Sequence, residues 1–203
     1  MSLHSKHHSD TGDKKQQIIE TAERLILENG FANTSINLIQ KTAEVSKGLI
    51  YYHFENKDDL GIAVLHHIFY LEFKDFEEFA GNITEVPDRS EVLQYLDEYL
   101  EKLFTSTMRE RSIIQIIIDL LLNLKSTSAK KQVKELYQNY LQKVANFLEH
   151  LEVEEPMIHA KLVFSVLDGL LYLNMALDED LADRENQYVI RALKCMVGLQ
   201  EEK

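Results

Sequence analysis

The chain has 203 residues, of which 45% are hydrophobic and 28% are charged, a composition typical of a globular protein and not of a disordered one. Because it contains only seven glycines, two prolines and one cysteine, the composition favours long helices over a turn-rich β fold and excludes an intrachain disulfide framework. Residues 1–57 carry no net charge and the formal charge of −12 falls on residues 58–203, which argues against unspecific binding of a polyanion but permits a nucleic-acid-binding head.

The chain begins with a polar stretch, MSLHSKHHSDTGDKK, that lacks the apolar core of a signal peptide. We expect residues 1–12 to form a disordered tail, whose three histidines would bind a metal only weakly. The most apolar run, IIQIIIDLLLNL, is shorter than a membrane span and contains three polar side chains. The sequence therefore predicts no membrane segment, and the single cysteine fits a reducing, cytoplasmic location.

The first part of the chain predicts four helices. Apolar side chains recur every three or four positions over residues 13–29, and Gly30 ends this first helix. Two short helices follow, and a fourth helix runs to about residue 81. The expected capping residues are Thr34 or Ser35, Ser46 and Asn56. Two short helices joined by a four-residue turn are the signature of a helix-turn-helix unit.

The third helix, SKGLIYYHF at residues 46–54, has two distinct faces. Ile50 and Phe54 share the face that packs inward, whereas the lysine, the glycine and both tyrosines lie outside this stripe. A helix of the protein core explains Ile50 and Phe54 but leaves the polar and aromatic residues unexplained. A helix that enters the DNA major groove accounts for all of them.

The segment TSINLIQKTAEVSKGLIYYHFENKDDL, together with the preceding ENGFANTS, resembles the DNA-binding head of the TetR family of bacterial transcriptional regulators. The resemblance covers about residues 13–70, and the rest of the chain shows only a compatible helical pattern. It implies an all-α fold of about nine helices, with a three-helix helix-turn-helix head at residues 13–70. Residues 71–203 would then form a larger helical body for ligand binding and dimerisation.

Three residues depart from the usual pattern of the family. Glu44 stands where the turn usually has a glycine, at a position that often needs a positive φ. Leu49 stands where threonine is frequent and can offer a base only an apolar contact, for example with a thymine methyl group. Asn37 replaces a frequent arginine of the second helix. We expect these departures to alter the base sequence that is read more than DNA binding itself.

Each predicted DNA contact also has a structural explanation. Lys47 can reach a guanine edge or a phosphate, or be merely solvated, and Gly48 can permit close approach to the groove. The Tyr51 hydroxyl is expected on a phosphate, Tyr52 on the backbone or a base, and His53 can instead brace the helix. The hydroxyls before the second helix can clamp a phosphate or cap that helix, and the lysine that opens the fourth helix is another clamp. The predicted DNA-binding residues are Thr34, Ser35, Asn37, Ser46, Lys47, Gly48, Leu49, Tyr51, Tyr52, His53 and Lys57.

Two patterns in the rest of the chain point to a core or to a ligand pocket. Phenylalanines recur every three or four positions along the fourth helix, as an ordinary core stripe or as the lining of a pocket. A helix expected at residues 109–125 carries three polar residues spaced by four, as a solvated face or as polar groups of a pocket. The residues predicted on the pocket reading are Phe69, Phe73, Phe76, Gln115, Asp119 and Asn123.

The end of the chain contains two strongly apolar segments, at residues 157–177 and 188–199, after a helix expected at 88–107. The resemblance implies that these last two helices form a four-helix bundle in a homodimer. A two-fold dimer also suits two helix-turn-helix heads, which must reach successive major grooves of a pseudo-palindromic operator.

The sequence contains no phosphate-binding glycine loop, nucleophile elbow or HExxH pair, so we expect no enzyme, cofactor or metal site. The predicted function is a DNA-binding transcriptional repressor that a small apolar or amphipathic effector releases from its operator. The alternative is a helical protein-interaction module whose head no longer reads DNA.

Overall fold

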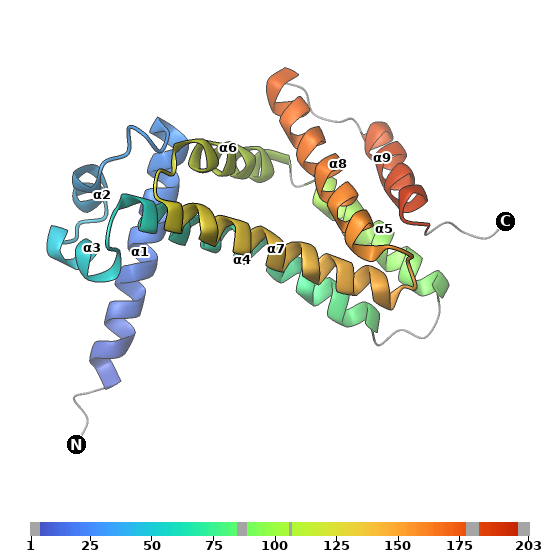
Figure 1. Ribbon diagram of the computed structural model, residues 1–203, viewed down its shortest axis with the longest axis horizontal. Coiled ribbons are helices and arrows are strands. Elements are labelled where there is room, and N and C mark those ends of the chain that lie inside the picture. Colours follow the sequence, from blue (N-terminus) through green and yellow to red (C-terminus); the bar gives the residue numbers. More distant parts are fainter. Residues whose placement is uncertain (1–4, 85–88, 106, 178–182, 199–203) are drawn as a thin grey trace. The chain divides into compact units, whose positions relative to one another are not determined.

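The computed structural model describes residues 5–84, 89–105, 107–177 and 183–198. All regular structure in these ranges is helical, which confirms the all-α class, and the nine helices there agree with the expected number. Figure 1 shows them in chain order: α1 (Ser5–Asn29), α2 (Ile36–Thr42), α3 (Lys47–His53), α4 (Lys57–Thr84), α5 (Arg89–Thr105), α6 (Thr107–Asn123), α7 (Thr127–His150), α8 (Pro156–Leu177) and α9 (Asp183–Met196).

Helix α1 begins earlier than the sequence predicted. Residues 5–12, expected to be disordered, already form its first turns, and residues 1–4 lie outside the described ranges. No proline interrupts this stretch, so the helix nucleated over residues 13–29 can propagate towards the N-terminus one backbone bond at a time. The prediction of a disordered tail was therefore wrong for residues 5–12.

The chain divides into two compact units. The first, here called the head unit, comprises Met1–Tyr70 and Gln115–Glu135, and the second, the body unit, comprises Leu71–Ile114 and Leu136–Lys203. Helices α4, α6 and α7 each belong partly to one unit and partly to the other. The sequence predicts Gln115–Glu135 as part of the body. The hydrogen bonds that join this segment to the head connect residues far apart in the chain, so no local pattern indicates them.

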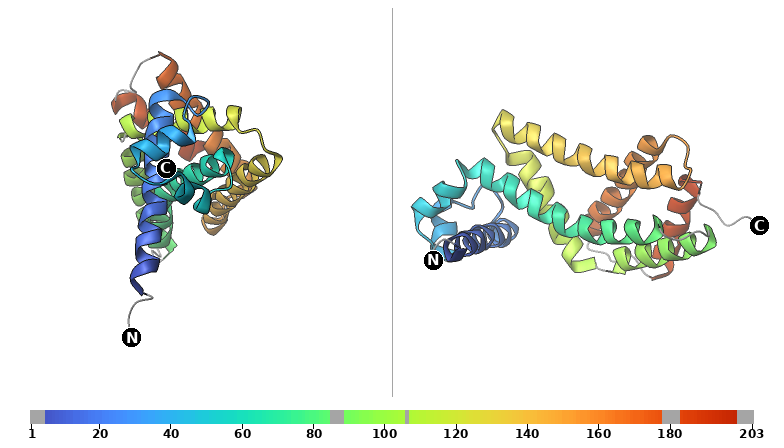
Figure 2. Two further views of the ribbon diagram at one scale, coloured as in Figure 1. Left: turned by 90° about the vertical axis from the view of Figure 1, so that its left-hand side faces the viewer. Right: turned by 90° about the horizontal axis from the view of Figure 1, so that it is seen from below.

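Helices α1, α2 and α3 lie against one another in the head unit (Figures 1 and 2), and their buried apolar side chains form one core. Ile18 and Ala22 of α1, Ile39 of α2 and Ile50 of α3 are almost fully buried in this core. Burial of a side chain of this size contributes about 1.5–3 kcal/mol. The core therefore fixes which face of α3 points outward.

The body unit has its own apolar core, built from α5, α7, α8 and α9. Leu96, Leu148, Ala160 and Leu193 contribute one buried side chain from each of these helices. Two ion pairs add to the packing: Lys194 to Asp97 at 2.8 Å, which joins α9 to α5, and Lys143 to Glu77, which joins α7 to α4. None of the described helices is both long and apolar enough to cross a membrane.

Helix α8 is apolar on more than one side. Ala160 faces the core of the body unit, yet large apolar side chains at other positions of α8 and at the start of α9 are exposed. These residues, here called the outer face of α8 and α9, are Ile158, Leu162, Tyr172, Leu173, Leu177 and Tyr188. A run of exposed apolar side chains on one element marks an interaction surface.

Candidate nucleic-acid interface

Two serines begin the two short helices of the head. The Ser35 hydroxyl accepts a hydrogen bond from the Leu38 N–H at 3.1 Å, and the Ser46 hydroxyl accepts one from the Leu49 N–H at 3.1 Å. These contacts confirm the predicted caps at Ser35 and Ser46. Both side chains are exposed, and each hydroxyl still has its own O–H to donate, so capping leaves both serines able to bind a phosphate.

The turn between α2 and α3 contains no glycine. Glu44 adopts a φ of 52°, the left-handed conformation that the glycine usual at this position would adopt more easily. The turn is fixed on both sides of this residue: the Val45 N–H donates to the Gln40 carbonyl at 3.2 Å, and Gln17 Nε2 of α1 donates to the Ala43 carbonyl at 3.0 Å. These contacts hold a conformation that disfavours glutamate.

Helix α3 presents an apolar face to the core and an aromatic, basic face to solvent. Ile50 and Phe54 are 0% and 3% exposed, whereas Tyr51 and Tyr52 are 49% and 75% exposed. Lys47 is exposed as well, with its ammonium 5.9 Å from the centre of the Tyr51 ring. The inward and outward residues of α3 are therefore those that the sequence predicted.

Gly48 lies on the outward side of α3. A Cβ atom at Gly48 would meet only the Ser46 hydroxyl, at 3.9 Å. Packing within the chain therefore does not require a glycine here. The remaining candidates of the helix-turn-helix differ in exposure: Asn37 of α2 is exposed and Leu49 of α3 is half-buried.

His53 lies at the end of α3, partly buried between aromatic rings. Its ring packs edge-on against Tyr52, with 4.9 Å between the ring centres. Burial, and after it the positive charge of Lys15, lowers the pKa of His53 below its ordinary value. Its buried Nε2 has no hydrogen-bond partner within the described part of the chain. A neutral ring packed in this way supports the bracing role weighed from the sequence.

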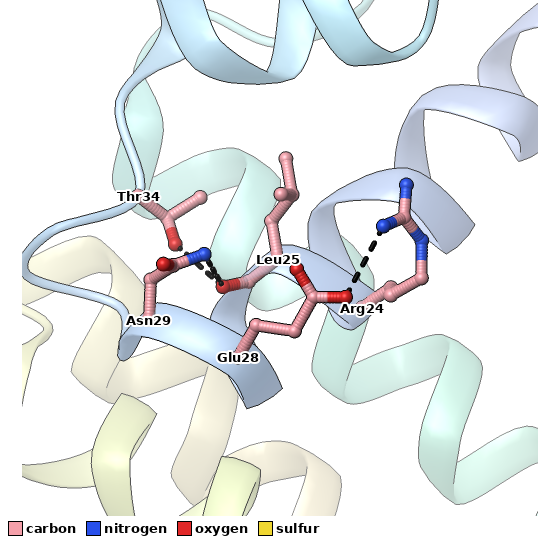
Figure 3. Close-up of polar contacts among 5 residues, drawn as sticks. All are labelled: Arg24, Leu25, Glu28, Asn29 and Thr34. Carbon is pink, nitrogen blue, oxygen red and sulfur yellow. Dashed lines mark hydrogen bonds and ion pairs between the residues drawn. The ribbon is translucent and has the colours of Figure 1, made fainter.

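Thr34 does not fit the predicted role of a phosphate clamp. Its side chain is 0% exposed, and its hydroxyl donates to the carbonyl oxygens of Leu25 at 3.0 Å and Gly30 at 2.9 Å. Figure 3 shows the Leu25 carbonyl accepting from both Thr34 and Asn29 at the end of α1. Because the threonine hydroxyl closes the end of α1, no phosphate can reach it, and the prediction for Thr34 was wrong.

Lys57 begins α4 and ties it to the connection between α1 and α2. Its ammonium donates to the Ala32 carbonyl at 3.1 Å and lies 4.4 Å from the centre of the Phe31 ring. Desolvation lowers the pKa of Lys57 despite the opposing effect of Asp58. The ammonium has three donors, so the contact with Ala32 leaves donors for the predicted phosphate contact.

The predicted pocket residues are divided between the two units. Phe69 belongs to the head unit, where it is buried, whereas Phe73 and Phe76 belong to the body unit and pack against its core. The polar stripe of α6 lies in the head unit. There Asp119 accepts a hydrogen bond from the Phe31 N–H, and Asn123 Nδ2 donates to Asp119 Oδ1 at 2.8 Å. Gln115 is exposed.

Within the body unit, Phe73 lies in a cluster of aromatic rings from three helices. Its ring centre is 3.7 Å from that of Tyr140 on α7 and 6.0 Å from that of Phe164 on α8. Phe76 packs edge-on against Phe147 of α7, with ring centres 5.6 Å apart. The stripe therefore belongs at least to a packed core, and its role in a pocket stays a prediction.

The sequence did not single out the pair Tyr137 and Asp168, one helical turn from the cluster on α7 and α8. Asp168 is exposed as a residue, yet the neighbouring helices desolvate its carboxyl enough to raise the pKa. Burial and the nearby Asp168 raise the pKa of Tyr137 to about 12. The sequence did contain a signal for this pair. Asp168 follows Phe164 by four residues in an otherwise apolar segment, and residues spaced by four share one helix face.

Comparisons with known proteins agree with this geometry. Residues 18–64 match the family model described as bacterial regulatory proteins, tetR family. The HTH-type transcriptional repressor NemR of Escherichia coli (strain K12) is 35% identical over 65 residues, which are 32% of this chain and 30% of NemR. The fatty acid metabolism regulator protein of Bacillus subtilis (strain 168) is 26% identical over 133 residues, 63% of this chain and 62% of that protein.

A solved structure extends the likeness in fold beyond the matched head. A TetR-family transcriptional regulator from Mesorhizobium loti MAFF303099 superposes with a TM-score of 0.73 at 18% identity, over 91% of this chain and 96% of that one. The helix-turn-helix geometry of residues 35–57 and the family match at residues 18–64 point to the same head. The head of the chain, at residues 18–64, is that of the TetR family of bacterial regulatory proteins.

Proposed function

We propose that the protein is a dimeric, cytoplasmic transcriptional repressor that binds a pseudo-palindromic operator and releases it when a small effector binds the body unit. The observation that carries this proposal is the outward face of α3. Tyr51 and Tyr52 are 49% and 75% exposed beside an exposed lysine, on a helix that the core of the head holds in place. The relation to a repressor, NemR, supports the same function.

The DNA contacts divide into clamps and readers. Ser35, Ser46, Tyr51 and Lys57 offer hydroxyl or ammonium donors, the groups that bind phosphate and fix orientation without reading sequence. The readers lie between these clamps on α2 and α3 and reach base edges in the major groove. They are Asn37, Lys47, Gly48, Leu49 and Tyr52, with His53 as the brace of the helix.

The outer face of α8 and α9 is the proposed dimer interface. Its side chains, including Leu162 and Leu173, are 44% and 51% exposed, on a helix that already contributes to the core of its own unit. The same apolar surface on a second copy is self-complementary under two-fold symmetry. A dimer also brings together the two heads that a pseudo-palindromic operator requires.

The proposed effector is apolar or amphipathic and binds the body unit. Phe73 and Phe76 supply aromatic surface, and Tyr137 and Asp168 supply polar groups one turn along α7 and α8. Among the polar anchors first predicted, Asp119 and Asn123 already bond within the head unit, so we rank them behind Tyr137 and Asp168. The chemistry of an aromatic surface beside a few polar groups is that of small-molecule sites in general.

Selection of duplexes from a random pool, at low salt and without effector, tests the proposal. We expect enrichment of an inverted repeat, bound by two chains. Its affinity should fall steeply as salt rises, because phosphate contacts release counterions. Enrichment of no inverted repeat would overturn the proposal and favour the alternative of a protein-interaction module.

A further inference from the structure

The connection between α1 and α2 is held from outside the helix-turn-helix by Asp119. The Asp119 carboxylate of α6 accepts a hydrogen bond from the Phe31 N–H, and the Asn123 amide holds the same carboxylate at 2.8 Å. The ring of Phe31 is 4% exposed. Asp119 of α6 therefore accepts from the Phe31 N–H, a backbone donor at the start of the connection to α2 that would otherwise have no partner.

Helix α4 closes tightly on the same point. A Cβ atom at Gly61 would lie 3.0 Å from Leu120 Cδ2 of α6 and 3.0 Å from the Phe31 ring. This separation is shorter than most contacts of a Cβ atom, so the two side chains would have to move by a few tenths of an ångström. A larger residue at Gly61 would have to displace these two side chains, because α4, α6 and the α1–α2 connection pack tightly here.

A second carboxylate makes the reciprocal contact. Asp58, in the first turn of α4, accepts from the Lys125 N–H at 2.9 Å and from the Ser126 N–H at 2.7 Å. Ser126 in turn begins α7, because its hydroxyl accepts from the Ala129 N–H at 2.9 Å. One aspartate of the head thus holds the connection between α6 and α7, while one aspartate of α6 holds the head.

We propose that Asp58 and Asp119 are positioning residues that fasten residues 115–126, here called the α6–α7 corner, to the DNA-binding helices. The corner and the DNA-binding helices then move as one body. Three helices lead from the body unit into this rigid body, so the effector signal does not depend on α4 alone. The link to DNA binding rests on the proposed function, whereas the fastening itself does not.

Hydrogen exchange of the full-length chain tests the fastening without DNA. Asp119→Ala, which leaves no acceptor for the Phe31 N–H, should speed exchange of the Phe31 amide by about 10- to 150-fold, the factor that corresponds to losing a hydrogen bond to a charged group. Gly61→Ala, which wedges the same junction without touching a carboxylate, should act in the same direction. Asp97→Ala removes a carboxylate that binds Lys194 in the body unit, and it should leave the exchange of Phe31 unchanged.

A second exchange measurement tests the coupling to DNA. Coupling between two sites is reciprocal. If the corner and the DNA-binding helices belong to one body, bound DNA must therefore change the amide exchange of the corner. The duplex enriched by selection should slow exchange at Lys125 and Ser126 by about threefold or more in the native chain. In Asp58→Ala, where these amides have lost their acceptor, the duplex should leave their exchange unchanged.

Unchanged Phe31 exchange in both Asp119→Ala and Gly61→Ala would overturn the fastening. An equal effect of DNA in Asp58→Ala and in the native chain would overturn the coupling. A chain that enriches no duplex would refute the proposed function alone. The exchange of Phe31 would then still decide whether the corner is fastened to the head.

Discussion

Two surfaces of this protein expose large side chains, and they differ in what surrounds those side chains. On α3, Tyr51 and Tyr52 lie beside a lysine, a glycine and capping serines. On the outer face of α8 and α9, tyrosines lie beside leucines and an isoleucine. Hydroxyl and ammonium donors suit a polyanion, whereas aliphatic side chains suit another apolar surface. Exposed large side chains mark both surfaces as interaction sites. Only the residues around these side chains indicate which kind of partner each surface binds.

The largest expected effect is a difference in the free energy of unfolding between substitutions on the two faces of α3. Ile50→Ala should lower the free energy of unfolding by about 2–5 kcal/mol, because Ile50 is fully buried and its truncation leaves a cavity. Tyr52→Ala should change the free energy of unfolding by no more than about 0.5 kcal/mol, as for an exposed residue, while it weakens DNA binding. Urea unfolding of both variants checks this, and similar losses in both would mean that Tyr52 supports the fold.

A charge on the outer face of α8 should break the dimer. Leu173→Glu should weaken self-association by about 2 kcal/mol or more, as expected for a central apolar residue of an interface. Gln138→Glu adds the same charge to the exposed side of α7 and serves as the control. Sedimentation over a range of concentrations measures the effect. Equal association of both variants would place the dimer contact elsewhere.

Clamps and readers on α3 should respond differently to the DNA sequence. Tyr51→Phe removes one hydroxyl and should weaken binding by about 1 kcal/mol on every sequence alike, because a phosphate carries no base information. Leu49→Thr should instead change the preferred base at one position of each half-site. Repeating the selection with each variant checks this. A uniform loss for Leu49→Thr would remove its role as a reader.

Replacing Glu44 tests a strain that both the sequence and the structure indicate. Glu44→Gly should stabilise the chain by about 0.5–1 kcal/mol, because glycine adopts a φ of 52° without the steric cost. The larger conformational entropy that glycine loses on folding offsets part of this gain. Thermal unfolding measures the change. A destabilised variant would show that the side chain of Glu44 makes a favourable contact that outweighs the strain.

The smallest expected effect is a pH dependence from His53. Burial lowers its pKa in the folded state, so between that lowered pKa and the ordinary value of 6.5 the unfolded chain binds more protons. Stability should therefore fall as the pH falls through this window, and His53→Gln should reduce the fall. Urea unfolding at several pH values checks the sign. Burial also lowers the pKa of His66, so part of the fall should remain in the variant.

Local chemistry made much of the head predictable. Serine caps, the alternation of buried and exposed positions along α3 and the need for a positive φ at Glu44 all depend on residues within a few positions of each other. Thr34 shows where such reasoning fails. A hydroxyl before a helix can cap, clamp or turn inward, and only the position of the Leu25 carbonyl, nine residues earlier, decided that it turned inward.

Longer separations explain the other differences between prediction and structure. The bond from Phe31 to Asp119 spans 88 residues, so no helical period indicates that α6 belongs to the head. The same polar stripe was read from the sequence as a solvated face or as pocket groups. Tyr137 and Asp168 were overlooked because each is a single polar residue, and only the pairing of α7 with α8 relates them.

Radical labelling of four exposed tyrosines tests most directly which surface binds DNA and which binds a second copy. In the single chain Tyr51, Tyr52, Tyr172 and Tyr188 are 49%, 75%, 52% and 57% exposed, so all four should react. We predict that Tyr172 and Tyr188 are protected in the free dimer, whereas Tyr51 and Tyr52 become protected only when the selected duplex is added. Full labelling of Tyr51 and Tyr52 at saturating DNA would contradict the account.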